Sequence, residues 1–472
     1  MVILIASAAA VSITAAGHAI LHKRDSRSAL GWMSLNLTLP LIGPFLYWFL
    51  GINRISRRAR RWSESGRRIS GAEIYPVDTE QEHYTVLPQE AFHLRDLRIL
   101  ADRVVKSRQR RGNCITPLID GEAAYPAMLE AIDSAQESIN LSSYIFDADG
   151  IGAEFVTRLK RAGERGVEVR IIIDGLGEKY SRVSLRKALA GSQVRVERFL
   201  PLRNGAYINL RNHRKLMVVD GFAAFTGGMN IRSRNQSFSF LQSTDIHDMH
   251  FRVLGPVVSD LQRTFLEDWH FVTGELLDAP RFFPKLEHSG SAFARCISDG
   301  PDREFRKLEQ IMLGGLSCSV KSVMIMMPYF IPDRPMVAAL ITTALRGVDV
   351  RIVLPGKNNL PIVHWASRAL LGELMNNGVR VFYQPPPFVH TKLFMVDGIW
   401  SLIGSANLDA RSLRLNFELD LSILDCAFAA DMGKHFEKAL AASTELTLDE
   451  LEQRSMPVKL RDNFARLFSP YL

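Results

Sequence analysis

Two histidine–lysine pairs with the same spacing, each followed by an aspartate, are the chemically most informative feature of the sequence. The first run is His213-Arg-Lys215-Leu-Met-Val-Val-Asp220, and the second is His390-Thr-Lys392-Leu-Phe-Met-Val-Asp397. After six further residues each run reaches a glycine- and asparagine-containing tail, Gly227-Gly-Met-Asn230 or Gly404-Ser-Ala-Asn407. A lone run would be a weak signal, but two copies with matching tails indicate a duplicated active site.

The spacing of histidine and lysine suits a phosphodiester. Residues at i and i+2 of an extended strand point to the same face, so each lysine can neutralise phosphate oxygens beside its histidine. Two such half-sites, brought face to face, place two imidazoles around one phosphorus. One imidazole can attack to form a phosphohistidine while the other protonates the leaving alkoxide, and the roles reverse when an alcohol attacks. The lysines would stabilise the negative charge of the transition state.

A nucleophilic imidazole also needs a partner that fixes its tautomer, usually a carboxylate. Glu418 lies 28 residues after His390 in an otherwise apolar run, and we expect it to serve His390. Asp248 is the corresponding expectation for His213. The apolar neighbours of Glu418 favour this role over that of a surface acid.

The tails complete the candidate site. Glycine and asparagine residues after a turn let backbone and amide donors approach a phosphate closely. No carboxylate cluster of metal-ligand type stands out, so we expect no metal and no cofactor. The predicted catalytic residues are His213, Lys215, Asp220, Asn230, Asp248, His390, Lys392, Asp397, Asn407 and Glu418.

An internal repeat should position these motifs. Each copy is expected to contain helix, strand, helix and strand in that order, over 125–137, 138–146, 151–165 and 167–174 in the first and over 306–316, 320–329, 336–346 and 348–354 in the second. Gly166 and Gly347 each separate a helix from a β-branched strand, as helix C-terminal glycines do. Strands alternating with helices predict an α/β fold with helices covering a sheet.

The repeat suggests a domain organisation. A stretch containing proline and glycine between residues 276 and 298 separates a first domain, 112–285, from a second, 286–472. The charged and weakly periodic residues 53–111 are expected to form a basic linker with some helix. The net charge of +8 favours an anionic partner, and charge alone does not separate nucleic acid from acidic lipid. Four widely spaced cysteines provide neither a disulfide framework nor a zinc site.

Residues 1–52 are expected to anchor the chain in a membrane. Two stretches without charged residues, 1–21 and 29–52, are each about the ~20 residues that a membrane-crossing helix needs. The first lacks the basic start of a secretory signal, which is the alternative. Pro40 and Pro44 lie inside the second stretch and predict a kinked or re-entrant segment.

Basic residues predict the orientation of this anchor. Three lie between the stretches, and seven arginines lie between residues 54 and 68. This excess places everything after Arg54 on the cytoplasmic side. The arginine run could instead bind nucleic acid, but its position beside a membrane segment favours anionic headgroups.

The paired motifs resemble the phospholipase D superfamily, and their context resembles bacterial cardiolipin synthases. The similar segments include Asn209–Lys215, Pro328–Asp333, Trp365–Arg368, Ser405–Ser412 and Arg466–Leu472. The resemblance implies two phospholipase D-like α/β domains packed as a pseudo-dimer behind an N-terminal membrane hairpin. It also implies phosphatidyl transfer between two phosphatidylglycerol molecules, giving cardiolipin and glycerol, with His213 as the nucleophile.

The same resemblance implies the partners and the location. They are phosphatidylglycerol and other anionic phospholipids, and a bacterial cytoplasmic membrane with the catalytic domains on its cytoplasmic side. No nucleic acid is expected, and the oligomeric state stays open. Ile246 and His247 depart from the family's usual Trp-Arg pair before Asp248, and the loop 384–389 is unusually rich in proline. A nuclease, a hydrolytic phospholipase D and a non-catalytic scaffold remain alternatives.

Overall fold

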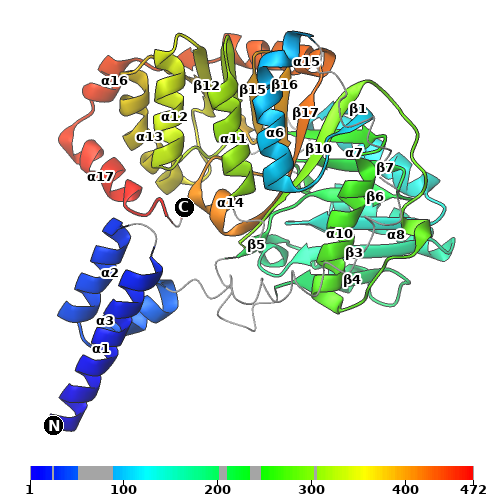
Figure 1. Cartoon of the computed structure of the whole chain (residues 1–472). Helices are drawn as coiled ribbons and strands as arrows, with labels where there is room; N and C mark the ends of the chain where they lie inside the picture. Colours follow the sequence, from blue (N-terminus) through cyan, green and yellow to red (C-terminus); the bar gives the residue numbers. More distant parts are fainter. Residues whose placement is uncertain are drawn as a thin grey trace.

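The body of the molecule consists of two α/β halves that share one long sheet, with a helical hairpin at the N-terminus (Figure 1). This computed structural model describes residues 2–23, 26–51, 89–200, 210–233, 246–301, 306–470 and 472. The strands follow the order β18-β13-β12-β11-β15-β16-β17-β10-β1-β9-β7-β6-β2-β3-β4, and β5 pairs with β17 off this path.

The two halves share a common core succession of strands and helices. The first half comprises β1 (Arg110–Ile119), α7 (Asp120–Ser134), β2 (Ser138–Ser143), α8 (Ile151–Glu164), β3 (Glu168–Asp174), η4 (Gly177–Tyr180), α9 (Leu185–Ala188), β4 (Arg195–Phe199), β5 (Arg211–Asn212), β6 (Leu216–Val219), β7 (Ala223–Gly227), β8 (Ile246–His247), β9 (Met249–Leu254), α10 (Val258–Thr273) and η7 (Pro280–Phe282). The second half comprises β10 (Ala292–Asp299), α11 (Lys307–Cys318), β11 (Ser322–Met326), α12 (Arg334–Leu345), β12 (Asp349–Pro355), α13 (Pro361–Met375), β13 (Arg380–Gln384), β14 (Phe388–Val389), β15 (Leu393–Val396), β16 (Trp400–Gly404), α14 (Ala410–Arg414), β17 (Asn416–Leu424), α15 (Cys426–Ala441), β18 (Thr444–Glu445), α16 (Leu448–Glu452) and α17 (Met456–Arg466).

The halves meet at the antiparallel pair β1 and β10, where Arg110 lies opposite Ala294 and Asn113 opposite Ala292. From this pair the strand order runs outward identically, through β9, β7, β6, β2, β3 and β4 on one side and β17, β16, β15, β11, β12 and β13 on the other. The α/β fold with a duplicated domain is therefore confirmed, and its pseudo-twofold axis passes between β1 and β10.

Glycines end the helices as the sequence predicts. Gly166 follows α8 with φ +91°, and Gly347 follows α12 with φ +88°, a conformation that side chains with a Cβ rarely adopt. The chain can then turn directly into β3 or β12. These two strands are almost entirely buried, since helices cover both of their faces.

The expected linker ends in structure that belongs to the second half. η3 (Gln89–Leu94) and α6 (Arg95–Val105) pack on α11. Ala91, Leu94 and Leu97 are buried in the same apolar cluster as Leu308 and Ile311. Residues 89–105 are thus part of a core. Residues 52–88, including the arginine run, lie outside the described residues.

The N-terminal residues form α1 (Val2–His22), α2 (Ser26–Thr38), α3 (Ile42–Leu46) and η1 (Tyr47–Gly51), which pack together as a hairpin (Figure 1). The second stretch is interrupted after Thr38, as its prolines predict, and the carbonyl of Pro40 accepts a hydrogen bond of 2.9 Å from the Ser12 hydroxyl. Large apolar side chains on the hairpin are exposed, among them Leu21, Leu41, Phe45 and Phe49. Within the described residues, no helix combines the length and apolar character needed to cross a membrane.

Candidate active site

Two short parallel strand pairs, each joining one half to the other, position the histidines. β5 pairs with the first residues of β17, and the backbone N–H of His213 donates to the Phe417 carbonyl at 2.9 Å. In the same way β14 pairs with β8, and the N–H of His390 donates to the His247 carbonyl at 2.7 Å. The strand before each histidine therefore runs beside the strand before the acid of the opposite half.

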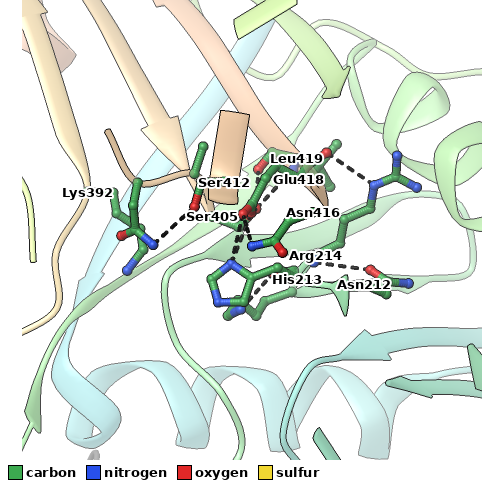
Figure 2. A network of polar contacts seen from close by, with 12 residues as sticks. Asn212, His213, Arg214, Lys392, Ser405, Ser412, Asn416, Glu418 and Leu419 are labelled. Carbon is green, nitrogen blue, oxygen red and sulfur yellow. Dashed lines mark hydrogen bonds and ion pairs between the residues drawn. The ribbon is translucent and has the colours of Figure 1, made fainter. Parts of the chain in front are cut away.

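This topology crosses the histidine–carboxylate pairs. Nδ1 of His213 lies 3.1 and 3.0 Å from the two carboxylate oxygens of Glu418, as Figure 2 shows. Nδ1 of His390 lies 2.7 Å from Oδ2 of Asp248. The pairing expected from sequence, Glu418 with His390 and Asp248 with His213, is therefore wrong. β17 and β9 each lie next to the central pair, so their acidic ends reach across the pseudo-twofold axis.

Burial keeps both imidazoles neutral. Desolvation lowers the pKa of His213 despite the opposing charge of Glu418, and it lowers the pKa of His390 to about 4. Burial alone would raise the carboxylate pKa values. The charges of Lys392 and His390 outweigh the effect of burial on Asp248. The charge of His213 outweighs it on Glu418, so both carboxylate pKa values lie below the ordinary range. An ionised acid accepting the Nδ1 proton leaves Nε2 of each histidine unprotonated, and Nε2 of His390 lies 3.2 Å from Nζ of Lys392.

The two lysines make equivalent hydrogen bonds to the backbone of their own motifs. Nζ of Lys215 donates to the carbonyl of His213, and Nζ of Lys392 donates to that of His390, each at 2.6 Å. Desolvation lowers the pKa of Lys215 to about 7 and that of Lys392 to about 8. An anion placed between them would favour their charged forms. In the described part of the chain, no three histidine, cysteine or acidic side chains are arranged as metal ligands.

The glycine-containing tails contact the carboxylates. A Cβ at Gly228 would lie 2.3 Å from Oδ1 of Asp248, so only glycine fits there. The equivalent residue of the second half is Ser405, whose hydroxyl donates to Glu418 at 2.5 Å. Asn416 adds a further donor to Glu418 at 3.0 Å. We expected the glycine to admit a phosphate, but at Gly228 it admits the acid that holds His390.

The two tail asparagines are used differently. Oδ1 of Asn230 accepts from the backbone of Ile145 at 3.1 Å, so this side chain ties the loop after β7 to the loop after β2. Nδ2 of Asn407 donates to the Ser412 hydroxyl at 3.2 Å, while its buried Oδ1 accepts no hydrogen bond from a described residue. That Asn407 contacts substrate stays a prediction.

The motif aspartates lie away from the histidines. Asp220 follows β6 and lies five residues beyond Lys215, about 16 Å of strand at ~3.3 Å per residue. Its carboxylate accepts three backbone N–H groups, each at 2.8 Å, from Gln136, Glu137 and Ser138. Asp397 accepts from Val320, Lys321 and Ser322 in the same way. These contacts fix the starts of β2 and β11, and a catalytic role for the two aspartates stays a prediction.

The middle residue of the first motif, Arg214, is one that the sequence interpretation passed over. Its Nε donates to the Glu418 carbonyl at 3.1 Å, and another nitrogen donates to the Ser298 hydroxyl at 2.6 Å. It also forms a buried ion pair with Asp268. Arg214 therefore ties the His213 strand to the strand of its acid. Its counterpart Thr391 has no side chain able to do this, and the difference was visible in the motif.

Aromatic rings flank both histidines. Tyr144 lies edge-on to His213 with ring centroids 5.2 Å apart, and Tyr329 lies 6.0 Å from His390 in the equivalent place. Phe388, from the proline-rich loop, is also 6.0 Å from His390. These contacts place both tyrosines beside the site.

Comparison with known proteins shows which family the chain resembles. The family model described as "Cardiolipin synthase, PLD-like domain" matches residues 128–269 and 313–440, and "Phospholipase_D-nuclease N-terminal" matches residues 10–51. The cardiolipin synthase of Oceanobacillus iheyensis is 29% identical over 96% of this chain and 95% of its own. That of Geobacillus sp. (strain WCH70) is 30% identical over 96% and 90%.

A solved structure shares the fold. Phosphatidylserine synthase of Haemophilus influenzae Rd KW20 superposes with a TM-score of 0.62 at 15% identity, covering 80% of this chain and all of that one. The two matched segments lie one in each half of the sheet, and each contains one histidine–lysine motif. The chain belongs to the cardiolipin synthase family of phospholipase D-like proteins.

Proposed function

We propose that the protein is a cardiolipin synthase, which transfers a phosphatidyl group from one phosphatidylglycerol to another and releases glycerol. The observation that carries the proposal is the crossed pair of imidazoles. Each histidine of one half is held by an acid of the other, with a buried lysine behind it. Both halves are needed to complete either imidazole, so the chain has one composite site for one phosphate.

In the first half-reaction, Nε2 of His213 attacks the phosphorus of phosphatidylglycerol. The P–O bond to the headgroup glycerol breaks, His390 in its protonated form transfers a proton to that oxygen, and glycerol leaves. The product is phosphatidyl-His213. Glu418 holds Nδ1–H and balances the charge of the substituted ring, while Lys215 and Lys392 stabilise the additional negative charge on phosphorus.

In the second half-reaction, the terminal hydroxyl of a second phosphatidylglycerol attacks the same phosphorus. His390 accepts the hydroxyl proton, the P–N bond to His213 breaks, and cardiolipin leaves. The enzyme returns to its starting protonation state, since His390 has lost one proton and regained one. If water attacks instead, the product is phosphatidic acid.

We further propose that the N-terminal hairpin binds a bacterial cytoplasmic membrane, with the two halves of the body on its cytoplasmic side. Exposed apolar side chains on the hairpin support the binding. The basic residues at 54–68 in the sequence support the orientation.

One experiment tests the proposed function. Purified full-length protein is incubated with phosphatidylglycerol carrying labelled acyl chains, and the lipid products are separated. Cardiolipin with an equal amount of free glycerol is expected. Phosphatidic acid alone would establish a hydrolytic phospholipase D, and turnover of nucleic acid but not lipid would establish a nuclease.

A further inference from the structure

The last long helix of the body, α17, presents an apolar stripe to solvent. Met456, Leu460 and Phe464 of α17, together with Leu467 and Phe468 in the turn that follows it, are each between 41% and 70% exposed. Isolated exposed apolar residues need no explanation, but a contiguous stripe along one helix indicates a binding surface. The rings of Phe464 and Phe468 contact each other at 5.4 Å, so the stripe is continuous.

The opposite face of α17 is fixed firmly to the body. Asp462 is fully buried and pairs with Arg368 of α13 at 2.7 Å and with Arg454 at 2.6 Å. Ala465 packs in a small cluster with residues of α13. The helix is therefore held in one orientation, and the body itself determines where the stripe points.

This cluster reaches the active site. It includes Tyr329, the ring that flanks His390. The chain end also returns to the site, since the carbonyl of Leu472 accepts from the backbone of Arg411 at 3.1 Å, just beyond the Asn407 tail. In Figure 1, α17 and the N-terminal hairpin lie on the same side of the body. The face of α17 opposite the stripe thus packs in the same cluster as the ring that flanks His390.

Basic residues border the stripe. At 100° per residue, Lys459 and Arg466 lie along one edge, whereas Arg461 on the other edge is held at 2.9 Å by the buried Asp462. The acid of this helix, Asp462, is buried. An apolar face between basic edges matches a bilayer surface, where alkyl groups enter and long basic side chains reach the headgroups.

Resting on the proposed function, we propose that the α17 stripe docks on an anionic phospholipid bilayer and brings the His390 half-site to the membrane surface. This would be a second contact besides the N-terminal hairpin. A substrate with two acyl chains must leave the bilayer to reach a buried pair of histidines. Docking the body on the bilayer through α17 shortens the path from the bilayer to the histidines.

Activity on two physical forms of the substrate tests the docking. The double variant Phe464→Asp/Leu467→Asp of the full-length protein is assayed on phosphatidylglycerol vesicles and on monomeric short-chain phosphatidylglycerol. Vesicle turnover should fall ~10-fold or more, because two large apolar side chains no longer enter the bilayer. Turnover of the monomeric lipid should not change. The matched control is Phe222→Asp, an exposed phenylalanine in the β6–β7 turn, which should change neither rate.

A readout without turnover separates docking from the proposed function. Phe464→Trp introduces a fluorophore into the stripe, and brominated lipids in the vesicles should quench the signal that this variant adds. Quenching with no cardiolipin formed from either substrate would support docking and reject the proposed function. No quenching, or equal loss of turnover on both substrates, would overturn docking. So would a detergent-solubilised dimer that the double variant dissociates, because the stripe would then bind a second copy of the chain.

Discussion

The two half-sites have the same backbone arrangement, but different side chains hold their histidines. On the His213 side, Glu418 also accepts from Ser405 and Asn416, so several donors share its charge. On the His390 side, Gly228 replaces the serine, and the shorter Asp248 faces His390 with Lys392 close by. Nζ of Lys392 lies 2.9 and 3.2 Å from the two nitrogens of His390.

This difference indicates a division of labour between chemically identical side chains. A ring held by a carboxylate in a fixed network is positioned and neutral, which suits a nucleophile. The pKa of His390 is lowered to about 4, first by burial and then by Lys392. When a bound phosphate allows the His390 ring to take up a proton, the resulting imidazolium is a strong acid and can protonate the leaving alkoxide. The comparison thus favours His213 as nucleophile and His390 as general acid.

The largest expected effects separate the two histidines. His213→Ala should abolish the phosphoryl-enzyme with any substrate, because the attacking atom is gone. His390→Ala should slow turnover by ~10²–10⁴, the usual contribution of general acid catalysis. A phosphatidyl ester of a nitrophenol, whose leaving group needs no proton, should restore formation of the intermediate in His390→Ala alone.

Rapid quenching with phosphorus-labelled substrate measures that intermediate. Acid-labile, base-stable label is expected on His213. Label on His390 with none on His213 would reverse the assignment and leave the composite site intact. An active enzyme carrying no label on either residue would exclude a covalent intermediate.

The crossed pairing predicts which acid supports which step. Glu418→Gln should impair attack by His213, so an activated leaving group should not restore it, although Glu418 lies in the second half. Asp248→Asn should behave like His390→Ala and be restored. Losses of ~10²–10⁴ in kcat are expected, since an amide in place of a triad acid favours the wrong tautomer. The opposite pattern would indicate that each acid serves its own half.

Much of this site could be predicted from the sequence, because the motif is local. His213 and Lys215 are two residues apart, and strand geometry alone places both on one face. The helix-ending glycines Gly166 and Gly347 are equally local. The duplicated motif also indicates one composite site.

The crossed acids could not be predicted, because they depend on which strand lies beside which. Glu418 is closer in sequence to His390, but β17 pairs with β5 of the other half. The structural role of Asp220 was missed for a related reason. A motif shows which residues accompany one another, and it does not show that a strand separates Asp220 from Lys215.

Arg214 offers a smaller perturbation that affects one half-site. Arg214→Lys keeps the charge but cannot reach Glu418, Ser298 and Asp268 together, because it lacks the planar fork of donors. Formation of phosphatidyl-His213 should slow by ~10-fold, with the dependence on leaving group unchanged. Thr391→Ser is the matched control in the second half and should leave both steps intact. Equal slowing of both steps would indicate a general structural role, which a thermal unfolding measurement would reveal.

The lysines predict a pH dependence of anion binding. Burial lowers the pKa of Lys215 to about 7 and that of Lys392 to about 8, so both lose charge as pH rises from 6 to 9. A phosphodiester favours the charged forms, so binding takes up protons and weakens with rising pH.

Calorimetry with a non-hydrolysable phosphonate lipid should show affinity falling by several-fold, an order-of-magnitude expectation from one to two lost charges. Lys215→Arg, which stays charged, should flatten the lower part of this profile. Affinity that is constant or rises with pH would contradict it.

The smallest expected effect on catalysis concerns Asp220. Its carboxylate accepts three backbone N–H groups before β2, and it lies a strand length away from Lys215. Asp220→Ala leaves these donors without their partner and should lower the free energy of unfolding by ~1–3 kcal/mol. The kcat of the folded enzyme should stay the same, because the carboxylate of Asp220 is engaged by backbone N–H groups at the start of β2. Asp278→Ala, which removes an exposed aspartate, is the control and should change neither quantity. Denaturant unfolding and turnover per folded molecule measure the two effects separately. A fall in kcat with unchanged stability would place Asp220 among the catalytic residues and show that the motif acts as one chemical unit.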